Sequence, residues 1–125
     1  MRGRIGLGFL LVLAACSGAA SPTGSVDCRE PVGGVLTVTA DDLVFDTACL
    51  ALPAGEAVTI AFDNTDTQPH DIVIWTDSST TTQLFAGEII DGGESIDYEV
   101  PPLDPGTFYF NCTVHPGMNG SVVVQ

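Results

Sequence analysis

Four side chains in the sequence have the donor types of a metal site. Cys112, His115 and Met118 follow one another at intervals of three residues, and His70 lies 42 residues before Cys112. One thiolate and two imidazoles in a plane, with a weak axial thioether, describe a mononuclear blue-copper electron-transfer site. Zinc is the weaker interpretation, because thioether sulfur is not among its usual ligands. The residue types and their spacing therefore predict a single copper ion.

The numbers of histidines and cysteines narrow the class of copper site. Two histidines in the whole chain are too few for a multicopper oxidase or a copper nitrite reductase. The ligand loop holds one cysteine, whereas a binuclear site of the cytochrome-oxidase type needs two. A four-ligand site offers no open position to a substrate, and no Ser/His/Asp grouping is evident, so we expect that the protein is not an enzyme. Taken singly, the residues have plainer interpretations: His70 as a surface histidine, Cys112 as a core thiol and Met118 as a packing residue.

Short β-strands must position these side chains. Runs of alternating or β-branched apolar residues are separated by clusters of Gly, Pro, Asn and Asp. The predicted strands span residues 35–39, 42–45, 57–62, 71–75, 95–100, 107–110 and 121–124. Residues 52–56 form a predicted turn, and residues 80–90 are compatible with a short helical turn. This spacing predicts an all-β fold, a Greek-key β-sandwich of about seven to eight strands.

Three segments resemble the cupredoxin family of blue type 1 copper proteins, in its plastocyanin- and amicyanin-like form. They are YFNCTVHPGMNGSVVV (109–124), PHDIVIW (69–75) and LPAGEAVTIAFDNTD (52–66), and the resemblance covers about residues 34–125. It implies a cupredoxin-like sandwich that holds one type 1 copper ion. The implied ligands are His70, Cys112, His115 and Met118.

The same resemblance implies roles for the surroundings of the ligands. The backbone N–H of Asp71 is expected to donate a hydrogen bond to the Cys112 sulfur. Many relatives have Asn where this chain has Asp71, so a side-chain tie to the ligand loop is not implied, and the carboxylate is expected to lower the reduction potential. His115 is expected near the surface within an apolar patch, as the exit for the electron. His70 is expected in a more enclosed position.

The N-terminal residues have the features of an export signal. Arg2 and Arg4 precede an uncharged apolar run that is too short to span a bilayer. The run ends in Leu13-Ala14-Ala15-Cys16, which resembles a bacterial lipobox and implies cleavage before Cys16 with a lipid on its sulfur. The alternative is an ordinary signal peptide in which Cys16 is incidental. The predicted domains are a lipoprotein signal peptide at 1–15, a lipidated Cys and flexible linker at 16–33, and a cupredoxin domain at 34–125.

Cys28 and Cys49 lie outside both the lipobox and the ligand loop. In an exported protein, two such cysteines favour a disulfide. It would join residues 21 apart in the sequence and contribute about 3 kcal/mol in the chain-entropy model. Two free thiols are the alternative.

Net charge bears on the partners of the protein. The 125 residues carry 16 Asp and Glu against three Arg, a formal charge of −13, and removal of residues 1–15 would leave −15 with Arg29 as the only base. Nucleic acid is an unsuitable partner, because phosphate neutralisation needs clustered Lys and Arg. An acidic body favours a basic redox protein or a membrane respiratory or photosynthetic complex as its partner.

The combined prediction is a monomeric electron-transfer protein of the bacterial cell envelope. It would be anchored by lipid at the outer face of the membrane, or periplasmic, and would carry one electron between redox partners. The same four ligands would also serve a copper carrier that delivers the ion to a membrane oxidase or acts in copper homeostasis. A metal-free adhesion or binding sandwich is the third hypothesis.

Overall fold

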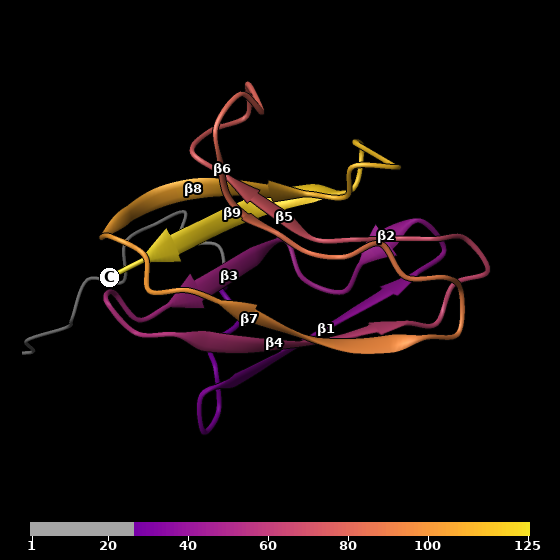
Figure 1. Cartoon of the computed structure of the whole chain (residues 1–125), viewed down its shortest axis with the longest axis horizontal. Helices are drawn as coiled ribbons and strands as arrows, with labels where there is room; N and C mark the ends of the chain where they lie inside the picture. Colours follow the sequence, from indigo (N-terminus) through magenta and orange to yellow (C-terminus); the bar gives the residue numbers. More distant parts are fainter. Residues whose placement is uncertain (1–26) are drawn as a thin grey trace, which may run out of the picture.

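Several of the strands form where buried and more exposed residues alternate along the sequence. The computed structural model describes residues 27–125, and these form nine strands and no helix (Figure 1). The strands are β1 (Val35–Asp41), β2 (Val44–Phe45), β3 (Cys49–Leu52), β4 (Val58–Asn64), β5 (Val73–Trp75), β6 (Gln83–Ala86), β7 (Ser95–Val100), β8 (Gly106–Asn111) and β9 (Asn119–Val124). The predicted all-β class is confirmed, and within this part of the chain the strand number is nine where seven to eight were expected.

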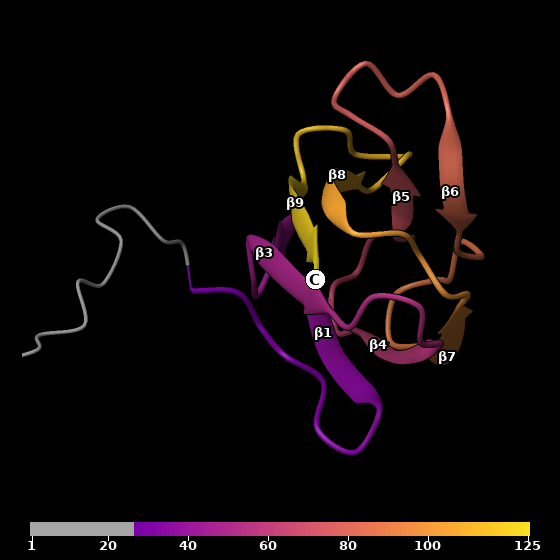
Figure 2. The same ribbon diagram turned by 90° about the vertical axis from the view of Figure 1, so that its left-hand side faces the viewer.

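The strands form two mixed sheets that pack face to face. One sheet has the order β2-β1-β4-β7 and the other β3-β9-β8-β5-β6. Figure 2 shows the layers, with β8, β9 and β5 above β1, β4 and β7. β1 pairs in parallel with β4, and β3 pairs in parallel with β9, while the other neighbouring pairs are antiparallel. The chain therefore crosses repeatedly between the sheets, and the predicted Greek-key β-sandwich is confirmed.

The core lies between the sheets and is built from the inward residues of each strand. Along β4, Val58, Ile60 and Phe62 are buried while the residues between them are more exposed. The ring of Phe45 lies 5.4 Å from that of Phe110 in the opposite sheet. Each such buried side chain contributes roughly 1.5–3 kcal/mol, so the core gives the end loops a rigid base.

Two of the observed strands were not predicted. Residues 80–90 contain the strand β6 and no helical turn, because Gln83–Ala86 pair with β5 at the edge of the larger sheet. Their burial does not alternate, so the sequence carries no strand pattern there. β3 was also missed, since Cys49–Leu52 are nearly all buried and form a short apolar run without alternation. Parallel pairing with β9 makes this run a strand.

The start of the described chain is fastened to the sandwich. The predicted disulfide is confirmed, since Cys28 and Cys49 are bonded. Beside it, the Arg29 N–H donates to the Cys49 carbonyl and the Ala51 N–H donates to the Arg29 carbonyl, both at 2.9 Å. The Arg29 guanidinium also pairs with Asp46 at 2.8 Å. The predicted signal peptide and Cys16 lie outside the described residues.

Across residues 27–125, no helix has the length and apolar character needed to cross a membrane.

Candidate metal centre

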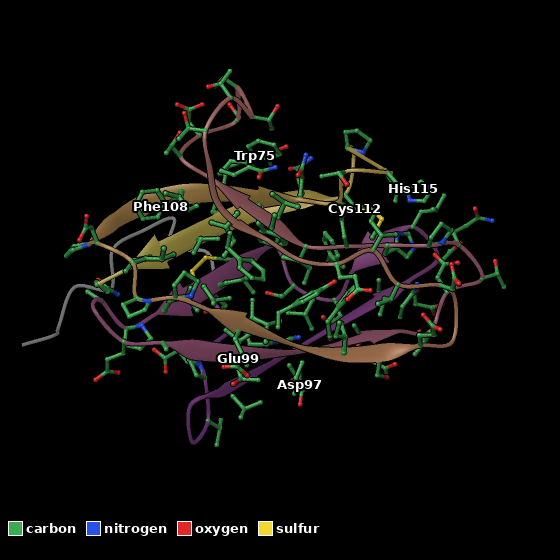
Figure 3. All side chains as sticks on the ribbon, in the orientation of Figure 1. Trp75, Asp97, Glu99, Phe108, Cys112 and His115 are labelled. Carbon is green, nitrogen blue, oxygen red and sulfur yellow. A yellow bond between two sulfur atoms is a disulfide. The ribbon has the colours of Figure 1, made fainter. Side chains whose placement is uncertain are left out.

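Two connections bring the predicted metal ligands to one end of the sandwich. His70 lies between β4 and β5, and Cys112, His115 and Met118 lie between β8 and β9. β5 and β8 are antiparallel neighbours with Val73 opposite Asn111. This register sets the residues before β5 beside the residues after β8. Figure 3 shows Cys112 and His115 together at this end.

Three donor atoms form a compact triangle. The Cys112 Sγ lies 3.6 Å from the His70 Nδ1 and 3.9 Å from the His115 Nδ1, and the two Nδ1 atoms are 3.2 Å apart. Donors that surround one ion in a plane, with about 2.0–2.3 Å to each N or S, would lie about 3.5–3.8 Å from one another. The observed triangle therefore fits a trigonal metal site. Its soft thiolate and two imidazoles match the equatorial donors of blue copper.

His70 is held through both its backbone and its ring, and it has no exposed surface. Its backbone exchanges two hydrogen bonds with Ile90, at 3.1 and 2.9 Å. Its Nε2 lies 2.9 Å from the Asp66 Oδ2. The His70 imidazole, followed by backbone N–H groups led by that of Leu43, holds the pKa of Asp66 far below its usual value. Since an ionised carboxylate only accepts hydrogen bonds, Nε2 carries the ring proton of neutral His70 and leaves the Nδ1 lone pair to the triangle.

The ligand loop is closed by its own backbone. The Cys112 N–H donates to the Met118 carbonyl at 3.0 Å, and the Met118 N–H donates to the His115 carbonyl at 2.9 Å. The Asn119 side chain donates to the Gly117 carbonyl at 3.2 Å. Met118, the predicted fourth ligand, is 5% exposed and so lies beneath the surface of this loop.

Asp71 links the β4–β5 loop, which carries His70, to the β8–β9 loop, which carries the other ligands. Its buried carboxylate accepts hydrogen bonds from the Thr113 N–H at 2.7 Å and the Thr113 hydroxyl at 2.5 Å. The side-chain tie to the ligand loop, which the resemblance left open, is thus made by the carboxylate. Burial raises the pKa of the Cys112 thiol, and backbone N–H groups, that of Asp71 first, act in the opposite direction. The backbone hydrogen bond from Asp71 to the sulfur stays a prediction.

His115 lies at the surface in apolar surroundings. It is half-buried, whereas His70 is fully buried. A shallow hollow beside it is lined by Leu43, Val114, His115, Pro116, Gly117 and Met118. Leu43 is 49% exposed and Val114 is 40% exposed. The patch expected around His115 is therefore present, with a contribution from the distant β1–β2 turn.

Asp66 and Leu43 are site residues that the sequence analysis missed. Asp66 follows β4 in a polar segment, and its acceptor role depends on a loop path that no local pattern encodes. Leu43 comes from a different sheet, and only the packing of the two sheets brings it to the ligand loop.

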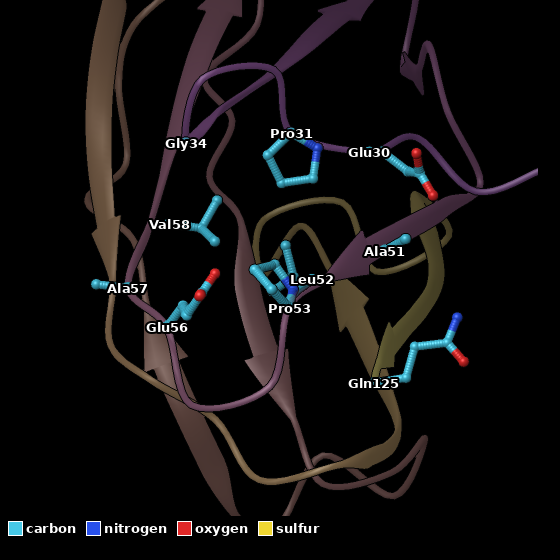
Figure 4. Close-up of a pocket in the computed structure, with 10 residues that line it drawn as sticks. All are labelled: Glu30, Pro31, Gly34, Ala51, Leu52, Pro53, Glu56, Ala57, Val58 and Gln125. Carbon is cyan, nitrogen blue, oxygen red and sulfur yellow. The ribbon is translucent and has the colours of Figure 1, made fainter.

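A second hollow lies at the opposite end of the sandwich, beside the C-terminus. Its volume is about 360 Å³, and its lining includes Glu30, Gly34, Leu52, Glu56 and Gln125 (Figure 4). The residues that line it include neither a histidine nor a cysteine. The donor triangle is therefore the stronger candidate for the functional site.

Comparisons with known proteins agree with this geometry. A family model described as a cupredoxin-like domain matches residues 6–124. Amicyanin-alpha of Methylorubrum extorquens is 31% identical over 121 residues, which are 95% of this chain and 98% of the relative. Reduced auracyanin from Roseiflexus castenholzii has a TM-score of 0.67 at 22% identity, covering 76% of this chain and 99% of that chain. Amicyanin from Paracoccus versutus has a TM-score of 0.54 at 22% identity, covering 86% and 87%.

The chain belongs to the cupredoxin-like family. The two solved structures have the same fold. Family and donor chemistry together make copper the cofactor, as one type 1 ion at the site of His70, Cys112, His115 and Met118.

Proposed function

We propose that the protein carries single electrons between redox partners through this copper site. Copper supplies a Cu(II)/Cu(I) couple when bound, and the protein supplies a site that changes little between the two states. The observation that carries the proposal is the triangle of Cys112 Sγ and the two histidine Nδ1 atoms. The pairing of β5 with β8, the backbone hydrogen bonds between His70 and Ile90, and the hydrogen bond from Thr113 to Asp71 hold the loops that carry these atoms. The three donor atoms therefore resist displacement when the charge of the copper changes.

Each ligand has its own proposed role. Cys112, His70 and His115 would hold the ion in the plane, and Met118 would be the weak axial ligand that tunes the potential. Enclosure of His70 keeps water from that side, because the side chain has no exposed surface. His115 reaches the surface among Leu43 and Val114. It is therefore the proposed exit for the electron.

A basic redox protein, or a basic face on a membrane respiratory or photosynthetic complex, is the proposed partner. The chain has a formal charge of −13, and complementary charge accelerates encounter in a salt-dependent way. The exposed apolar side chains of Leu43 and Val114 would then make the close contact around His115. We propose that the protein acts as a monomer.

We propose that the site acts outside the cytoplasm of a bacterium, in the cell envelope. The disulfide between Cys28 and Cys49 suits an oxidising compartment. Residues 1–15 would be removed as a lipoprotein signal, and lipid on Cys16 would hold the domain at the outer face of the membrane. Mass spectrometry of the protein isolated from its native membrane tests this: an unmodified Cys16 would remove the anchor and leave a periplasmic protein.

The test of function is the absorption spectrum and redox titration of the copper-loaded protein. A strong thiolate-to-Cu(II) band near about 600 nm that disappears on one-electron reduction is expected. Cys112→Ser should abolish the band. Rapid electron self-exchange with slow copper loss to a chelator supports electron transfer, whereas the reverse pattern would favour the copper-carrier hypothesis.

A further inference from the structure

One carboxylate oxygen joins the buried ligand to the surface patch. The Asp66 Oδ2 lies 2.9 Å from the His70 Nε2 and accepts the Leu43 N–H, also at 2.9 Å. The other oxygen, Oδ1, accepts the Thr67 N–H at 2.7 Å. The carboxylate is therefore oriented by its own loop and reaches both the His70 ring and the β1–β2 turn, which lie beyond the ends of the paired strands β4 and β1.

Leu43 stands in a backbone conformation that needs such support. It occupies the two-residue turn between β1 and β2, in which Asp42 has a φ of 50° and Leu43 a φ of 60°. Turns of this kind require a positive φ at both central residues and favour Asn, Asp or Gly, so leucine is unfavourable there. A strained residue at a functional surface persists where its surroundings fix it. The bond from its N–H to Asp66 is one such restraint, and it presents the Leu43 side chain beside His115.

We propose that Asp66 is a positioning residue whose Oδ2 atom fixes both the orientation of the His70 ring and the conformation of the turn that contains Leu43. Toward the metal, it fixes the His70 tautomer and places a negative charge behind a ligand, which favours the oxidised state of the site. Toward the surface, it holds the part of the patch that comes from the other sheet. The metal-side half of this inference rests on the proposed function, because it assumes that His70 binds copper.

Asp66→Asn and Asp42→Asn form a matched pair for the test. Both remove one negative charge, and Asn tolerates the positive φ at residue 42. Only Asp66→Asn weakens the Oδ2 bridge, because an amide has one acceptor oxygen and the carboxylate has two. Each variant is made in the full chain, and its thermal unfolding is recorded to verify that it folds.

On the metal side, the readout is the reduction potential. At a fixed potential, Asp66→Asn should shift the ratio of oxidised to reduced copper about tenfold toward reduced, equivalent to about 59 mV for one electron. Asp42→Asn should shift it much less. Equal potentials in the two variants would overturn this half of the proposal. If the unaltered protein lacked the band near about 600 nm, the proposed function would fail instead.

On the surface side, the readout is hydrogen exchange of the Leu43 amide, which is measurable in copper-free protein. The amide should exchange slowly in the unaltered chain and at least about tenfold faster in Asp66→Asn, with no such change in Asp42→Asn. A Leu43 amide that already exchanges freely in the unaltered chain would overturn the surface half. That measurement needs neither a variant nor copper, so it can overturn the surface half even if Asp66→Asn does not fold.

Discussion

The two hydrogen bonds from Thr113 to Asp71 allow the structural and electrostatic effects of one buried carboxylate to be separated. Asp71→Ala removes both acceptors, whereas Asp71→Asn keeps an oxygen for the Thr113 N–H and offers an amide group to the Thr113 hydroxyl. Both substitutions remove the charge. Stability should therefore differ between the variants, and the reduction potential should move in the same direction in both.

The magnitudes follow from the contacts. A hydrogen bond to a charged group contributes about 1.5–3 kcal/mol, and the lower end applies here because Thr113 is exposed and water can replace the lost acceptors. Asp71→Ala should thus lower the free energy of unfolding by about 2–3 kcal/mol, and Asp71→Asn by less than about 1 kcal/mol. Loss of a unit charge several ångström from the metal, at an effective dielectric constant of about 20, is worth on the order of 1–2 kcal/mol, or about 40–90 mV upward in potential.

The assay combines denaturant unfolding of the copper-free protein with redox titration of the copper-loaded protein. Asp97→Asn is the control, because Asp97 is an exposed acid on β7 in the other sheet (Figure 3). It should change neither quantity appreciably. The reasoning would be refuted if Asp71→Asn were as unstable as Asp71→Ala, or if neither variant raised the potential above that of the control.

Three further predictions concern the disulfide, the strained turn and the ligand thiol. Replacing Cys28 by Ser together with Cys49 by Ala should cost about 3 kcal/mol and lower the melting temperature by roughly 10–20 °C, and an unchanged calorimetric transition would show that the bridge contributes no stability. Leu43→Gly should relieve a left-handed conformation that costs leucine about 1–2 kcal/mol, so stability should hold or rise while the association rate with a basic redox partner falls in stopped-flow measurements. Lower stability with an unchanged rate would contradict that expectation. Burial raises the pKa of the Cys112 thiol, so the copper-free protein keeps this proton at neutral pH and must release it on binding. The apparent copper affinity, measured by competition with a chelator, should therefore fall at least about tenfold per unit of decreasing pH between about pH 8.5 and 7, and an affinity independent of pH would be inconsistent with a protonated thiol.

Strands that have one buried face were predictable from sequence, because burial of alternate residues leaves a pattern of period two. β4 and β7 are examples, with buried residues at every second or nearly every second position. β3 and β6 were not predictable in this way. β3 is buried at three of its four residues and pairs in parallel with β9, and β6 is a partly exposed edge strand without alternating burial, fixed by its neighbour β5.

The donor set was predictable because copper requires particular atoms, and the sequence contains few of them. The contacts behind the ligands were not predictable. Asp66 accepts from Leu43 across 23 residues of sequence, and Asp71 accepts from Thr113 across 42. Such contacts depend on loop paths at the end of the sandwich, which strand periodicity does not determine.

The order of the strands also governs when the ligand triangle comes into existence. The loop that carries Cys112, His115 and Met118 is completed by β9, which pairs with both β8 and the distant β3. Contacts between remote parts of a chain form slowly, because the entropy cost of closing a long loop precedes the favourable contacts that the closure allows. In a chain exported as proposed, N-terminus first, β9 would cross the membrane after the other eight described strands. His70, Cys112 and His115 would then come together only after translocation, so copper would be acquired outside the cytoplasm.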